Sequence, residues 1–154
     1  MSIFACPVYS INVKIFPKSA FVEKFSRAYL EFYGVSDTDA SYEARIFLNN
    51  PKAEIALGYN LHKGYVGSFR VFGHAGCSGD VGHCHVQAKR AYDTRAKTGA
   101  NPLYKRVEVT RAIKKLASKS SAINVTIVPY ITGGSERCDY EKSLSFDQIK
   151  LITV

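Results

Sequence analysis

Apolar and polar residues alternate along several short runs of this chain, which is the pattern of β-strands with one buried face. The runs are rich in valine, isoleucine, tyrosine and phenylalanine, which favour extended backbone. Turn-forming residues separate them, such as Asn49-Asn50-Pro51 after one run and Gly133-Gly134 after another. The pattern predicts strands over residues 8–16, 29–35, 41–48, 67–72, 104–109, 122–131 and 146–154, with a weaker strand and a loop within 53–63.

Two segments carry more detail than simple alternation. Residues 122–131 form the most apolar run, so we expect this strand to be central in its sheet, while Pro129 places its late part at an edge or bulge. Residues 111–119 have the spacing of a short helix with Ile113 and Leu116 turned inward. Thr110 precedes this segment and is expected to be its N-cap.

Seven or eight short strands with turns between them and one short helix predict an all-β fold, a β-sandwich. The length of 154 residues, without an internal repeat or a linker, predicts a single domain over residues 1–154. Residues 87–102 are polar and without a pattern, so we expect a long surface loop there.

The formal net charge of +8 is the main feature of the composition, since the apolar content of 46% and the charged content of 22% are ordinary. A solvated basic surface and a surface for an acidic partner both fit this charge. Nucleic acid is not expected as a partner, because the cations are scattered and no recognition motif occurs. The nearest approach to a basic stripe is formed by Lys105, Arg106, Arg111, Lys114, Lys115 and Lys119.

No run of eighteen apolar residues occurs, so no membrane association is expected. The first ten residues lack the basic and apolar regions of a secretory signal, and this predicts a cytoplasmic protein with reduced thiols. Cys6 and Cys138 are isolated in sequence, and we expect them to be buried as small apolar residues or to pair with each other.

The segment 67–85 is the richest in candidate chemistry, because five thiol or imidazole side chains follow a predicted strand and alternate with glycines. Glycine lets the backbone fold back so that such side chains converge. Thiolate and imidazole ligands suit Cu(I) or Zn(II). The candidate metal ligands are His74, Cys77, His83, Cys84 and His85.

The spacing of these ligands leaves three interpretations open. In extended backbone His83 and His85 share one face while Cys84 points away, so they can form one metal-ligand set with Cys77. A disulfide between Cys77 and Cys84 competes with that set. Ordinary turn chemistry with hydrogen-bonded histidines is the third interpretation.

Five pieces of the chain, in this order, resemble the β-domain that follows the copper domain in type-3 copper proteins, the group of tyrosinases, plant polyphenol oxidases and molluscan hemocyanins. The resemblance covers roughly residues 29–154 and is carried by short motifs whose order and spacing add to their specificity. The pieces are residues 44–49 (ARIFLN), 67–69 (GSF), 107–116, 124–129 (NVTIVP) and 146–152.

The resemblance implies a jelly-roll-like β-sandwich that covers the dicopper site of a helical oxidase domain and pushes one side chain into its substrate pocket. In some bacterial systems a separate small protein, called a caddie, has this role and helps to load copper, and some fungal relatives carry cysteines that assist copper incorporation. By their position in predicted loops, Tyr59, Tyr65 and Tyr92 are the candidates for that side chain.

The chain departs from the complete enzyme in its histidines. A dicopper site needs six imidazoles, and this sequence has four histidines in total. We therefore expect no phenol oxidase activity from this polypeptide alone, and interpret it as an accessory domain with a tyrosinase-like oxidase domain as partner and copper as the expected metal. The alternatives are a stand-alone copper- or zinc-binding module and a basic protein-interaction domain.

Overall fold

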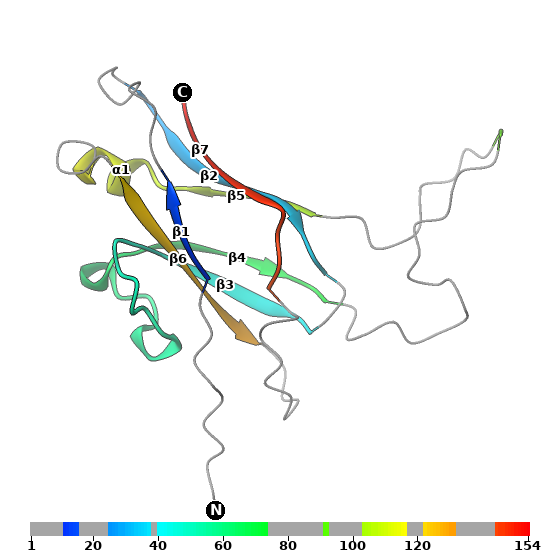
Figure 1. Ribbon diagram of the computed structural model, residues 1–154, viewed down its shortest axis with the longest axis horizontal. Coiled ribbons are helices and arrows are strands. Elements are labelled where there is room, and N and C mark those ends of the chain that lie inside the picture. The colour runs from blue at the N-terminus through cyan, green and yellow to red at the C-terminus, as the bar shows by residue number, and fades with distance from the viewer. Residues whose placement is uncertain are drawn as a thin grey trace, which may run out of the picture.

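The computed structural model describes residues 11–15, 25–37, 40–73, 91–92, 103–116, 122–131 and 144–154. Within these residues the chain forms two antiparallel sheets and one α-helix, which agrees with the predicted all-β class (Figure 1). One sheet has the strand order β1-β6-β3-β4 and the other the order β5-β2-β7. The strands are β1 (Ile11–Ile15), β2 (Ala28–Val35), β3 (Tyr42–Leu48), β4 (Tyr65–Val71), β5 (Leu103–Glu108), β6 (Ile123–Ile131) and β7 (Gln148–Thr153).

The two sheets share one apolar core, because each turns the apolar side of its alternating strands toward the other. Leu30 and Phe32 of β2 and Ile127 of β6 have almost no exposed surface. The ring of Phe32 lies 4.9 Å from the ring of Phe69 in β4, centroid to centroid, so the contact joins the two sheets. Strand alternation thus predicted the core correctly, since burying such side chains is the main favourable term in folding.

The two sheets approach each other closely between β4 and β5. A Cβ atom added at Gly67 of β4 would lie 2.6 Å from Cγ1 of Val107 in β5. Val107 itself is buried in the core. A side chain at position 67 would therefore have to displace the buried valine.

Strand β6 pairs with β1 on one side and with β3 on the other, so the prediction that it is central is confirmed. Ile127 is the last residue of β6 that pairs with a described residue of β1. Pro129 lies beyond this point and pairs with Ala44 of β3. The residues that precede Ile11 lie outside the described part of the chain, so the predicted edge or bulge at Pro129 stays a prediction.

The predicted weak strand within 53–63 is wrong, because this segment forms two short 3-10 helices, η2 (Ile55–Leu57) and η3 (Leu61–Lys63). The side chain of Asn60 accepts hydrogen bonds from the backbone N–H groups of His62 and Lys63, which starts η3. Gly58 and Gly64 end the two helices with positive φ angles of 56° and 91°. Local side-chain and glycine geometry thus outweighs the weak strand pattern.

The helix α1 spans Thr110–Leu116, so it begins one residue before the expected start, and its expected last residues lie outside the described part of the chain. Ile113 is completely buried in the core. The Thr110 hydroxyl accepts the N–H of Ala28 in β2 at 3.0 Å and donates to Glu108 at 2.8 Å. The expected N-cap role of Thr110 is therefore wrong, since its side chain connects the helix to β2.

Gly64 and Gly58 both have positive φ angles, but only Gly64 lies close to another part of the backbone, so Gly58 can serve as its control. A Cβ at Gly64 would lie 2.5 Å from the carbonyl oxygen of Leu48, whereas a Cβ at Gly58 would meet nothing within 4 Å. Gly64→Ala should lower the free energy of unfolding by about 3 kcal/mol, from left-handed strain plus the backbone clash. Gly58→Ala should cost about 1 kcal/mol, from the strain alone. Urea denaturation of both variants measures the difference, and equal losses would contradict the clash.

Candidate functional site

The five predicted metal ligands, His74, Cys77, His83, Cys84 and His85, lie outside the described residues. Their segment belongs to the connection between β4 and β5, whose described ends are Gly73 and Leu103. The N–H of Gly73 donates to the Ser41 hydroxyl at 3.0 Å, which fixes the described start of the connection beside the residue that precedes β3. Among the residues that the structure describes, no group of three or more histidine, cysteine, aspartate or glutamate side chains could hold a metal.

Tyr59, the first of the three candidate pocket residues, lies between η2 and η3 and is 53% exposed. Its hydroxyl is not available to a partner, because it donates to the Glu43 carboxylate at 3.0 Å. Its ring packs edge to face against Tyr65, with centroids 5.3 Å apart. The structure therefore holds Tyr59 against the sheet.

Tyr65 and Tyr92 differ strongly in their surroundings. Tyr65 begins β4, and its half-buried ring packs between Tyr59 and Phe47, with the Phe47 ring centroid at 5.7 Å. Tyr92 is fully exposed and has a φ of 73°, in the left-handed region. Among the three tyrosines, only Tyr92 presents its whole side chain to solvent.

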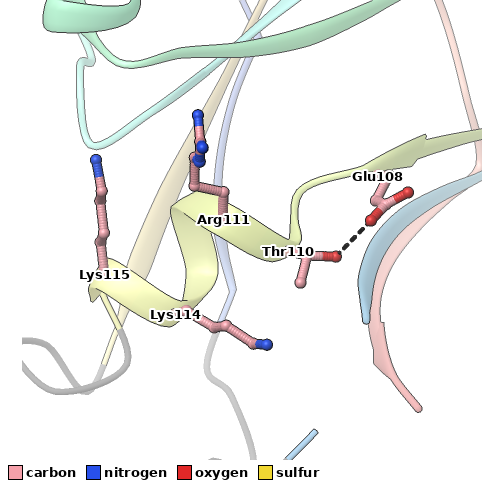
Figure 2. Close-up of a pocket in the computed structure, with 5 residues that line it drawn as sticks. All are labelled: Glu108, Thr110, Arg111, Lys114 and Lys115. Atoms are coloured by element: carbon pink, nitrogen blue, oxygen red, sulfur yellow. Dashed lines mark hydrogen bonds between the residues drawn. The ribbon is translucent and has the colours of Figure 1, made fainter. Parts of the chain in front are cut away.

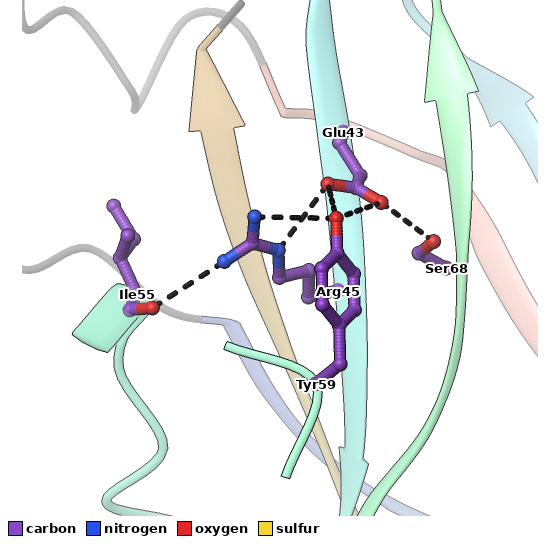
Figure 3. Close-up of polar contacts among 5 residues, drawn as sticks. All are labelled: Glu43, Arg45, Ile55, Tyr59 and Ser68. Atoms are coloured by element: carbon purple, nitrogen blue, oxygen red, sulfur yellow. Dashed lines mark hydrogen bonds and ion pairs between the residues drawn. The ribbon is translucent and has the colours of Figure 1, made fainter. Parts of the chain in front are cut away.

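A buried carboxylate organises the outer face of the four-stranded sheet (Figure 3). Glu43 of β3 is 3% exposed and accepts hydrogen bonds from the hydroxyls of Tyr59 and Ser68, the latter at 2.8 Å. Arg45, two residues further along the same face, donates through Nε to Glu43 at 3.2 Å. Burial opposes ionisation, but these three donors together hold the pKa of Glu43 below its usual value.

Arg45 connects this carboxylate to the segment that covers it. Its guanidinium lies between two aromatic rings, 4.6 Å from the centroid of Tyr59 and 4.7 Å from that of Tyr130 in β6. A further donor of the guanidinium reaches the carbonyl of Ile55 in η2 at 3.4 Å. Each partner of the ion pair is satisfied, so the cluster fixes the segment 49–64 on the sheet and offers no free group for catalysis.

A basic hollow lies beside α1 and is shown in Figure 2. Arg111 and Lys115 extend to one side of the helix, and Lys114 extends to the other, toward Glu108 and Thr110. Lys114 also lies over the ring of Phe25, 5.6 Å from its centroid. The lining of the hollow contains three cations and a single carboxylate, which already accepts from Thr110, so an anionic group is the ligand that the hollow would favour.

Sequence reasoning missed the carboxylate clusters on both sheets. In the three-stranded sheet, Tyr29, Glu31 and Tyr33 of β2 lie on the outer face, and the Glu31 carboxylate accepts from the hydroxyls of Tyr33 and of Tyr104 in β5. The sequence contains one signal for this cluster, because Tyr29, Glu31 and Tyr33 are spaced two residues apart and therefore share one face of a strand. Their partners on neighbouring strands could not be predicted, because the sequence of one strand does not give its register with another strand.

The lowered pKa of Glu43 generates a prediction for stability in acid. A carboxylate whose folded pKa lies below its unfolded value stabilises the fold above the ordinary value of 4.5, and loses this contribution as the pH falls through the folded pKa. Glu43→Gln should cost about 3 kcal/mol at pH 7, because it leaves Arg45 buried without its carboxylate. It should also lose less stability than the native chain between pH 5 and pH 2.

Urea denaturation across this pH range measures both effects. Glu54→Gln is the control, since Glu54 is an exposed carboxylate within the segment that covers Glu43. An unchanged acid slope in Glu43→Gln, with the control also unchanged, would contradict the assigned role of Glu43.

No family model matches the sequence, and no curated protein matches it. In the described part of the chain, no helix is long and apolar enough to cross a membrane.

Proposed function

We propose that this chain is a non-catalytic accessory domain that docks on a tyrosinase-like dicopper oxidase domain, covers its active site and assists copper loading. The antiparallel two-sheet architecture agrees with the fold that the sequence resemblance implies. Three of the resembling pieces, residues 44–49, 67–69 and 124–129, fall on β3 (with the residue after it), β4 and β6, which are neighbours in one sheet. These three pieces therefore belong to one structural unit.

A jelly-roll-like sandwich is the finer form of this fold that we propose. Among the described strands, only β3 and β4 are consecutive in sequence and also belong to the same sheet. Every other connection between the described strands passes from one sheet to the other. Repeated crossing of this kind is typical of Greek-key and jelly-roll sandwiches.

The observation that carries the functional proposal is the content of the connection between β4 and β5. This one connection holds the five predicted thiol and imidazole ligands, and it also holds Tyr92, whose side chain is fully exposed. A cover that fills a neighbouring pocket needs an aromatic side chain with no partner of its own in the domain. Tyr92 meets this requirement better than Tyr59, whose hydroxyl is bound to Glu43, and better than Tyr65, whose ring is packed.

A basic protein-interaction domain is the second candidate function, and the hollow beside α1 favours it. Arg111, Lys114 and Lys115 line this hollow, and the chain as a whole has a formal charge of +8. Such a surface attracts an acidic partner of any activity. The oxidase test below distinguishes the two candidates.

The cover function predicts inhibition through Tyr92. Mixing the chain with a type-3 copper oxidase domain that lacks its own β-domain should form a complex and suppress phenol oxidation. Tyr92→Ala should restore the rate by about tenfold, which corresponds to about 1.4 kcal/mol lost in the pocket. Leu61→Ala is the control, because Leu61 is also a strongly exposed apolar side chain, at 71%, and lies on a different segment. Unchanged oxidation and no complex would contradict the cover function.

The copper-loading function predicts stoichiometric Cu(I) binding that depends on the β4–β5 connection. The double variant Cys77→Ser/Cys84→Ser should lose this binding, because thiolates are the preferred ligands of Cu(I). Cys6→Ser/Cys138→Ser should retain it. Titration against a Cu(I) chelator measures the affinity, and thiol alkylation with mass spectrometry shows whether Cys77 and Cys84 form a disulfide instead. Equal affinity of all three proteins would contradict the metal site.

A further inference from the structure

The outer face of the three-stranded sheet carries an ordered set of tyrosines and cations, which we call the tyrosine face. It consists of outward-facing residues of β5, β2 and β7. Two rows of residues lie directly opposite one another across the three strands, Glu108–Tyr29–Ile152 and Arg106–Glu31–Lys150, and the second row places Glu31 between Arg106 and Lys150. Beyond them Tyr33 lies opposite Gln148, and its ring is close to that of Tyr104 in β5.

Glu31 lies at the centre of the tyrosine face and below its surface. The residue is 9% exposed, and its carboxylate accepts from the hydroxyls of Tyr33 at 2.5 Å and Tyr104 at 2.7 Å. Arg106 lies close by, with its Nε 3.6 Å from the same carboxylate. The hydrogen bonds from Tyr33 and Tyr104 hold the pKa of Glu31 below its usual value. Its negative charge is therefore satisfied within the domain.

The aromatic rings of the face are held in place before any partner arrives. The guanidinium of Arg106 stacks 3.5 Å from the ring centroid of Tyr29, and the ammonium of Lys150 lies 5.0 Å from that of Tyr33. The rings of Tyr33 and Tyr104 lie 5.2 Å apart. Side chains fixed in this way lose little entropy on binding, which favours affinity.

What the tyrosine face presents to solvent is aromatic surface and positive charge. Tyr104 is 50% exposed and the Arg106 side chain 43% exposed. The two carboxylates of the face are engaged, Glu31 by the tyrosines and Glu108 by the Thr110 hydroxyl. Tyrosine and arginine are the residue types that dominate binding energy in protein interfaces. The exposed cations select a partner surface that carries carboxylates.

The position of the tyrosine face connects it to the proposed metal-binding loop. β5 begins at Leu103, where the β4–β5 connection returns to the sheet, and Tyr104 is the next residue. Tyr104 packs on Tyr33 at the same end of the sheet. The described end of the connection that carries the predicted ligands therefore lies next to the tyrosine face.

We propose that the tyrosine face is the docking surface for a folded protein partner that places carboxylates opposite Arg106 and Lys150. This inference rests on the proposed function, which makes the partner the oxidase domain. Nucleic acid fits this face less well, because its two projecting cations flank a carboxylate and do not form a continuous track for phosphates.

The test measures binding of the full chain to the oxidase domain by surface plasmon resonance at two salt concentrations. Lys150→Glu and Tyr104→Ala should each weaken binding by about tenfold, and the double variant Arg106→Glu/Lys150→Glu by more than either. Binding of the native chain should weaken with salt. Lys52→Glu/Lys63→Glu makes the same charge change at exposed positions in the segment 49–64, outside the tyrosine face, and should bind like the native chain.

Circular dichroism of each variant separates lost binding from lost folding, and Lys150→Glu is the variant that leaves the hydrogen bonds of Glu31 in place. If the native chain binds and the face variants bind equally well, the docking surface is wrong while the cover function stands. If the native chain does not bind the oxidase domain, both proposals fail. A labelled single-stranded oligonucleotide bound through the same residues would overturn the assignment of a protein partner.

Discussion

A carboxylate that accepts hydrogen bonds from hydroxyl groups and pairs with an arginine organises the outer face of each sheet. Glu43 accepts from Tyr59 and Ser68, Glu31 accepts from two tyrosines, and in each case the arginine also stacks on a tyrosine ring. Removing a carboxylate from water is costly unless its oxygens are hydrogen-bonded, and both clusters meet this condition with donors from separate strands or loops. The two clusters therefore fix the strands and the loop that supply those donors.

The two clusters differ in what lies above them. The segment 49–64 covers Glu43, and Arg45 connects it to the sheet through Tyr59 and Ile55. Phe47 and Val128 are completely buried under this segment in a second, smaller apolar cluster. The cluster on the four-stranded sheet is thus a structural device. No described segment covers the tyrosine face in this way, and its rings and cations remain exposed. The Glu43 cluster therefore holds a covering segment in place, whereas the Glu31 cluster leaves a surface that a partner can contact.

Much of the strand content could be predicted from alternation. Residues 29–35 and 41–48 were predicted as strands and appear as Ala28–Val35 and Tyr42–Leu48. The pattern failed at 53–63, because Ile55 and Leu57 alternate like strand residues although they lie in a 3-10 helix that packs on Phe47. Alternation reports which side chains are apolar, and it does not distinguish a strand from an irregular cover that buries the same side chains.

The candidate site was predicted only in part. The three tyrosines were chosen by position in loops, and contacts with residues far away in sequence then distinguished them. Tyr59 is held by Glu43, sixteen positions earlier, and no local pattern shows that pairing. The docking surface was not visible either, because it needs Tyr33 and Tyr104 side by side across a strand pair. Residues 74–90, which carry the predicted ligands, lie outside the described residues.

The close approach at Gly67 has a consequence for the spacing of the two sheets. β4 lies at the end of one sheet and β5 at the end of the other, and Gly67 of β4 abuts Val107 of β5. A side chain at position 67 would have to displace this buried valine, and with it the strand that carries it. The glycine therefore sets how closely the two end strands can approach each other.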